Sequence, residues 1–206
     1  MGRPAVIQRD RVAEVTLQLI DDEGIEAVSI ERIATMLGVK GPSLYHHFAD
    51  KAEILTSVAE LVLGDLDMDR PTTDWQDWMV ETSLILFERV VAHPRAATVL
   101  LQYMPDAPMT NGLGRAAQMM TEAGVDPAVQ VLIMEGTEKM IWGWALQRAV
   151  THSDRLDPTI IANKWPQLAT AVRKSRWNDV ELVTASLRAF LAGVLDGQFE
   201  PVRSRR

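Results

Sequence analysis

Residues 29–55 read SIERIATMLGVKGPSLYHHFADKAEIL and decide the fold that the sequence predicts. Ser29 can cap a helix whose apolar positions recur at spacings of three and four residues. These positions are Ile30, Ile33, Ala34 and Leu37. Gly38 follows directly, as is typical of a helix C-terminus, and Pro42 suits the first turn of another helix. Two helices separated by so tight a turn indicate a helix-turn-helix.

The short helix from Pro42 has one apolar side, because Leu44 and Phe48 are four residues apart. We expect both in the core. The outward side then presents donors, a small backbone and aromatic surface: Lys40, Gly41, Pro42, Ser43, Tyr45 and His46. Hydroxyls, a lysine and free amides at a helix N-terminus favour phosphate oxygens, and such a helix fits the DNA major groove.

The rest of the chain predicts an all-α protein, since apolar residues recur at three and four and alternating β-branched residues are almost absent. An upstream stripe of Val12, Val15 and Leu19 ends at Gly24. Proline and glycine breaks leave helical segments near 74–92, 95–104, 111–123, 128–150 and 179–196, and Lys51 begins another helix after the motif.

Composition limits the classes of function. The absence of cysteine excludes a disulfide framework, a thiolate metal site and a cysteine nucleophile. The first residues meet charges early, and no later window is apolar enough to span a membrane, so we expect a cytoplasmic protein without a membrane partner. The net charge of -7 argues against binding a polyanion over the whole surface. The basic residues among the first 51 nevertheless fall on the N-terminal arm and around the motif: Arg3, Arg9, Arg11, Arg32, Lys40 and Lys51.

Catalytic and metal-binding motifs are missing from the sequence. It contains no G-x-S-x-G, P-loop or H-E-x-x-H pattern and no distinctive pair of carboxylates. His46 and His47 are adjacent, so on a helix they point about 100° apart, and no acidic or cysteine partner completes a metal site. His93 lies beside a helix break, where a surface or capping role is expected. We expect neither enzyme activity nor a metal or cofactor.

Residues 8–55 resemble the TetR-type transcriptional repressors. The family has the same residue types at positions matching Ala34, Gly38, Val39, Leu44, Tyr45, Phe48 and Lys51. The resemblance implies an N-terminal three-helix DNA-binding unit, a linking fourth helix and a larger helical domain that dimerises and holds an effector. It therefore predicts a helix-turn-helix DNA-binding domain at 1–51 and an effector-binding and dimerisation domain at 52–206.

The resemblance also implies roles for individual residues around a recognition helix at 42–47. Those expected to face base edges are Lys40, Gly41, Pro42, Ser43 and His46, where Gly41 offers only close backbone approach. Those expected to meet phosphates are Ser29, Tyr45, His47 and Lys51. Arg3, in a short basic arm, is expected to reach along the DNA backbone or into a minor groove.

Soft and aromatic residues of the larger domain are candidates for an effector pocket. They are Trp78, Phe87, Met104, Met119, Met134 and Trp142. For each of them ordinary core packing is the alternative. A further apolar stripe on 179–196 fits either a dimer interface or packing within the subunit: Val183, Leu187, Phe190, Leu191 and Val194.

These features predict a homodimeric regulator of transcription, a repressor that binds a palindromic operator in double-stranded DNA and is released by a small, largely apolar effector. The alternative is a helical protein-interaction module whose helix-turn-helix docks on a protein partner.

Overall fold

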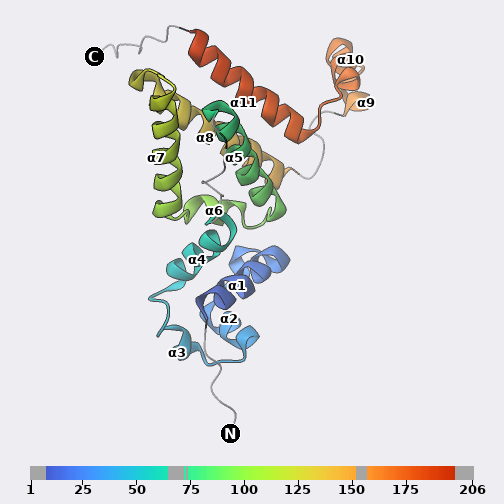
Figure 1. Cartoon of the computed structure of the whole chain (residues 1–206). Helices are drawn as coiled ribbons and strands as arrows, with labels where there is room; N and C mark the ends of the chain where they lie inside the picture. The colour runs from blue at the N-terminus through green and yellow to red at the C-terminus, as the bar shows by residue number, and fades with distance from the viewer. Residues whose placement is uncertain (1–7, 65–71, 73, 152–156, 198–206) are drawn as a thin grey trace, which may run out of the picture.

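Helices form every regular element in the residues that the computed structural model describes, which are 8–64, 72, 74–151 and 157–197 (Figure 1). Their bounds are α1 Arg9–Glu23, a 3-10 turn Ile25–Ala27, α2 Ile30–Leu37, α3 Gly41–Leu44, α4 Lys51–Leu63, α5 Trp75–Ala92, α6 Ala97–Gln102, α7 Asp106–Glu122, α8 Pro127–Val150, α9 Pro158–Ile161, α10 Pro166–Lys174 and α11 Asp179–Asp196. The predicted all-α fold is confirmed. No helix among these residues has the length and hydropathy needed to cross a bilayer.

Capping residues and left-handed glycines fix the first four helices at one end of the molecule. Gly24 ends α1 with a φ of 91°, and Gly38 ends α2 in the left-handed region with a φ of 67°. The Ser29 hydroxyl accepts a hydrogen bond of 3.2 Å from the Arg32 amide and so starts α2. Asp50 does the same for α4, accepting from the Glu53 amide at 2.9 Å. The predicted helix starts and stops around the motif are therefore present in the structure.

The helix α4 connects the helix-turn-helix to the rest of the fold. One of its faces packs on α1, and Leu44 and Phe48 from the α3 segment are buried in the same cluster. The helix also contacts α6 and α5 above it (Figure 1). The predicted domain boundary after residue 51 thus falls at the start of a helix whose side chains serve both parts.

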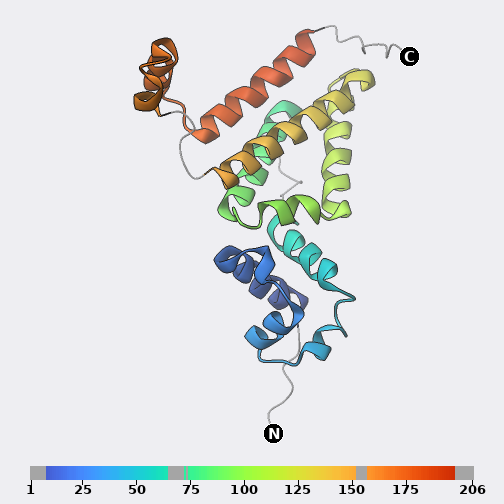
Figure 2. The ribbon, with the colours of Figure 1, turned by 180° about the vertical axis from the view of Figure 1, so that it is seen from behind.

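The larger part is built on the packing of α5 against α8, with α7 beside them and α11 across both (Figure 2). α8 and α11 lie at the end away from α3. Most of the α11 stripe is buried inside the subunit, namely Val183, Leu187, Leu191 and Val194. Phe190 packs so closely over Gly136 of α8 that a Cβ there would lie 2.3 Å from the ring. For the buried positions the structure shows packing within the subunit.

Two additional helices and two shifted helix ends differ from the sequence-based expectation. The helices α9 and α10 occupy a stretch between Val150 and Asp179 where none was predicted, and their prolines stand in the first turn. α7 begins at Asp106 rather than 111 and has Pro108 near its start. Proline is tolerated there because the first amides of a helix need no intrahelical partner. α3 ends at Leu44, and the rest of the predicted recognition helix is a turn.

The left-handed Gly38 predicts a measurable destabilisation on substitution. Gly38→Ala should lower the free energy of unfolding by about 1 kcal/mol, because a Cβ disfavours this conformation although no atom lies within 4 Å of it. Gly114→Ala, in the middle of α7 with open space around it, is the matched control and should raise that free energy by about 0.5–1 kcal/mol. Denaturant unfolding of both variants measures the difference, and changes of the same sign would contradict this account.

Candidate functional site

The exposed face of α3 brings together most of the predicted DNA-binding residues. Leu44 and Phe48 are inside, at 0% and 2% exposure, so the opposite side of the segment faces solvent. Lys40, Pro42, Tyr45, His46 and His47 are exposed there, and Gly41 and Ser43 are partly exposed. A set of donors and aromatic surfaces therefore stands on one convex end of the molecule.

Ser29 and Lys51 border this face. A Cβ on Gly41 would lie 3.9 Å from Ile30, so the starts of α2 and α3 are adjacent and Ser29 lies beside α3. The Ser29 hydroxyl accepts from Arg32 in the cap and keeps its own proton for a further acceptor. Lys51 is exposed at the first position of α4. Arg3, the remaining predicted DNA-binding residue, lies outside the described residues.

Ion pairs leave the lysines, rather than the arginines, available at this end. Arg11 pairs with Glu14 at 2.8 Å and Arg32 with Glu23 at 2.8 Å. The Arg32 contact holds the pKa of Glu23 below its ordinary value, chiefly through the side-chain hydrogen bond. Lys40 and Lys51 form no ion pair with any described residue. A phosphate group that approached this face could therefore pair with either lysine without breaking an ion pair of the described residues.

Arg9 ties the α3 segment to α1 and α4. From the start of α1 its guanidinium donates to the backbone carbonyl of His47 and, at 2.7 Å, to the Glu53 carboxylate. The same group lies 4.2 Å from the centre of the Phe48 ring, a cation–π distance. Arg9 was noted in the sequence only as a basic residue, because its partners are 38 or more positions away.

Glu53 completes this contact from the other side. One carboxylate oxygen receives Arg9, and the other accepts a 2.6 Å hydrogen bond from the Ala49 amide. The amide first and Arg9 second lower the pKa of Glu53 below its ordinary value of 4.5. The spacing of Asp50 and Glu53 is that of a capping pair, which is the one part of this cluster that the sequence signals.

A second cluster joins the connection between α5 and α6 to the C-terminal end of α1. His93 Nδ1 lies 2.7 Å from a carboxylate oxygen of Asp21, and both side chains are half-buried. Arg95 donates to the backbone carbonyls of Asp21 and Asp22, where the negative end of the α1 dipole favours a cation. Nearby, Arg89 of α5 donates to the carbonyl of Val62 in α4 at 3.1 Å. The larger domain thus contacts the smaller one through defined polar bonds.

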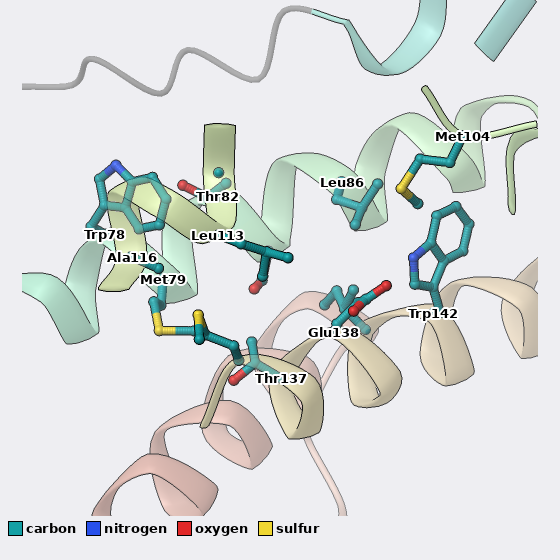
Figure 3. A pocket seen from close by; sticks show the side chains of 14 residues that line it. Trp78, Met79, Thr82, Leu86, Met104, Leu113, Ala116, Thr137, Glu138 and Trp142 are labelled. Carbon is teal, nitrogen blue, oxygen red and sulfur yellow. The ribbon is translucent and has the colours of Figure 1, made fainter. Parts of the chain in front are cut away.

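A cavity of about 130 Å³ lies between α5, α7 and α8 (Figure 3). Trp78, Met104, Met134 and Trp142, four of the six predicted pocket residues, line it. Phe87 and Met119 are buried elsewhere in the core and do not reach it. The lining also includes polar residues that were not predicted from the sequence, namely Thr82, Ser83, Thr137 and Glu138.

Comparison with known proteins supports a single family. Residues 13–58 match the model of "Bacterial regulatory proteins, tetR family". The tetracycline repressor protein class E of Escherichia coli is 22% identical over 151 residues, which cover 72% of each chain. The fold resembles that of the Streptomyces coelicolor TetR family protein ActR in complex with (S)-DNPA, with a TM-score of 0.71, 21% identity and 93% and 98% of the two chains covered. It also resembles BioQ with its natural double-stranded DNA operator, with a TM-score of 0.59, 20% identity and 89% and 99% covered.

The Arg9 and Glu53 contact predicts a pH-dependent contribution to stability. The lowered pKa of Glu53 means that the ionised carboxylate stabilises the fold above pH 4.5 and that this contribution is lost as the pH falls through the lowered value. Glu53→Gln should therefore reduce the melting temperature at neutral pH, and the deficit should shrink on acidification below 4.5. Glu60→Gln, an exposed change in the same helix, is the control. Melting curves across this pH range measure the effect, and a deficit that stays constant with pH would rule it out.

Proposed function

Because this chain belongs to the TetR family of transcriptional regulators, we propose that it is a repressor that binds a palindromic operator as a homodimer and releases it on binding a small, largely apolar effector. Members of the family are DNA-binding regulators rather than enzymes. The observation that carries the proposal is the solvent-facing side of α3, inside the matched residues 13–58, beside which Lys40 and Lys51 form no ion pair with a described residue.

The roles proposed for the α3 face follow from its chemistry. Lys40, Ser43 and His46 present donors toward base edges, Gly41 permits close approach, and Pro42 offers an apolar contact for a thymine methyl. The hydroxyls of Ser29 and Tyr45, together with His47 and Lys51, stand at the sides of this face and suit phosphate oxygens. Direct base contacts from one such short segment read few base pairs, so a specific site requires two copies.

The exposed faces of α8 and α11 support pairing of two subunits at the far end from α3. On α11 three small residues at a spacing of four face solvent: Ala185, Ala189 and Gly193. On α8, Val131 and Leu132 are exposed, at 61% and 40%. Small side chains let helices approach closely, and exposed apolar groups gain from being covered. A twofold axis through this surface would direct both α3 faces toward the same side.

The cavity and the contacts between the domains support the proposed release mechanism. An effector held between α5, α7 and α8 would favour one arrangement of these helices over another. The polar bonds from His93, Arg95 and Arg89 then transmit the difference to α1 and α4, which carry α3. Two recognition segments that no longer match successive major grooves lose operator affinity, and the same coupling lowers effector affinity on DNA.

Selection of binding sites from random duplex DNA tests the proposal directly. The purified protein should recover a twofold-symmetric site, and a salt titration on that site should show a steep loss of affinity as counterions compete. Folded protein that recovers no site at low salt, with or without added effector candidates, would favour the alternative that the helix-turn-helix docks on a protein partner.

Removing either Lys40 or Lys51 should weaken binding to all DNA sequences. In a dimer, Lys51→Ala deletes one phosphate-binding cation from each subunit, and Lys40→Ala deletes one cation at the bases that also displaces counterions. In either variant the slope of log affinity against log salt should become shallower by about 2. Lys174→Ala, an exposed lysine of α10 remote from α3, is the control and should leave the slope unchanged. Fluorescence anisotropy with labelled operator at several salt concentrations gives these slopes, and an unaltered slope in both variants would contradict a phosphate role.

Breaking the proposed dimer surface should reduce operator affinity without unfolding the subunit. Ala189→Arg places a long charged side chain on the exposed face of α11, and light scattering should then report a monomer. Operator affinity should fall by about two orders of magnitude or more, because the second half-site no longer binds as part of the same molecule. Gln118→Arg, on the exposed side of α7, adds the same charge as a control. A dimeric Ala189→Arg protein would show that the interface lies elsewhere.

A further inference from the structure

The cavity between α5, α7 and α8 contains a concentration of unpaired buried polar atoms. Five buried side-chain nitrogen or oxygen atoms in the described residues lack a hydrogen-bond partner, and three of them belong to cavity residues: Thr82 Oγ1, Thr137 Oγ1 and Trp142 Nε1. Thr137 and Trp142 are only 4% and 5% exposed. Buried polar groups in folded proteins are normally paired, so a cluster of exceptions in one cavity points to a ligand that pairs them.

Trp142 determines whether the ligand must donate or accept a hydrogen bond. The indole N–H is a donor only, whereas a threonine hydroxyl serves either as donor or as acceptor. In Figure 3 the indole nitrogen lies on the edge of the ring turned toward Leu86 and Glu138. A group that satisfies it must therefore be a hydrogen-bond acceptor, and the two hydroxyls can adapt to the same ligand.

Glu138 determines which charge the hydrogen-bond acceptor of the ligand can carry. It stands one turn before Trp142 on α8, is half-buried and pairs with no basic side chain in the described part of the chain. None of the described residues that line the cavity is lysine, arginine or histidine. A carboxylate or phosphate ligand would meet a like charge with no compensating cation among the described lining residues, in a mostly apolar cavity, which is unfavourable. Because Glu138 retains contact with solvent, it does not itself require a cationic ligand.

In this conformation the space inside the cavity is enough for about one ring. Its volume of about 130 Å³ is close to the roughly 150 Å³ engineered cavity that accepts benzene. Indole and thioether side chains around it suit a flat apolar body, and Met79, Met104 and Met134 can adapt their shape to substituents.

We infer that the cavity binds a compact, uncharged ring compound that carries a carbonyl-type acceptor, with the acceptor against Trp142 Nε1 and with anions excluded by Glu138. This inference rests on the proposed function, since it takes the cavity to be the effector site. It adds the chemical class of the ligand and the residues that select it.

Four probes on one skeleton test the inference. Acetophenone carries a neutral acceptor, α-methylstyrene replaces the carbonyl oxygen by a methylene group, 1-phenylethylamine is a cation at neutral pH, and benzoate is an anion. Dissociation constants for the full-length protein come from ligand-observed NMR titrations. Acetophenone should bind more tightly than benzoate and the amine. Its preference over α-methylstyrene is expressed as the ratio of the dissociation constant of the alkene to that of the ketone.

Two variants separate the acceptor contact from general hydrophobicity. Trp142→Phe keeps an aromatic ring but removes the N–H, so the ratio of alkene to ketone dissociation constants should fall by about three- to tenfold. Glu138→Gln removes the charge, so the ratio of the benzoate to the acetophenone dissociation constant should fall by about tenfold. Trp165→Phe, at an exposed residue directly before α10, should change neither ratio. The Glu138→Gln result keeps the test decisive if Trp142→Phe is poorly folded.

The outcomes distinguish this inference from the proposed function. Tighter binding of benzoate or the amine, unchanged ratios in both variants, or no binding of acetophenone to folded protein would each overturn the ligand class. Operator binding by the same wild-type preparation is measured in parallel. Intact operator binding with failed probe selectivity rejects only the ligand class, whereas selective probe binding by a protein that binds no duplex DNA rejects the proposed function.

Discussion

The burial of Leu44 and Phe48 is the contact on which the presentation of α3 depends. A helix of four residues has no stability of its own, since nucleating even one turn is unfavourable. Burying two large apolar side chains contributes about 1.5–3 kcal/mol each and fixes which side of the segment faces outward. Arg9 adds directional contacts, to the His47 carbonyl and over the Phe48 ring. The orientation of the exposed residues of α3 thus depends on the burial of Leu44 and Phe48 rather than on helix propensity.

Local chemistry made much of this fold predictable, and tertiary contacts explain what was missed. Gly24, Gly38 and Ser29 act through their own backbone or their nearest turn, so a single sequence displays them. The partners of Arg9 and His93 lie far away along the chain, and no local pattern indicates them. Periodicity marks Phe87 and Trp142 equally as apolar helix positions, but only packing decides that one fills the core and the other borders a cavity. Pro158, interpreted as part of a break, instead starts α9, because the first turn of a helix and a loop share the same residue preferences.

The polar bonds between the two parts of the molecule give the cavity a physical route to α3. α5 contributes side chains to the cavity and is followed directly by His93, whose partner Asp21 is near the end of α1. Arg89, also on α5, holds the carbonyl of Val62 near the end of α4. A shift of α5 would alter both bonds, so an effector that moved this helix would act on α1 and α4 together. Coupling of this kind requires no contact between a ligand and the helix-turn-helix.

The pairing of the arginines around α3 has a consequence for the search along a chromosome. Attraction to DNA of arbitrary sequence comes almost entirely from unneutralised cations, and here Arg9, Arg11 and Arg32 are each held by a carboxylate. The net charge of -7 repels the duplex further. If the chain binds an operator as proposed, we expect few of its copies to be held at the millions of competing sites that a genome presents, so that a small number of molecules per cell would fill the operator.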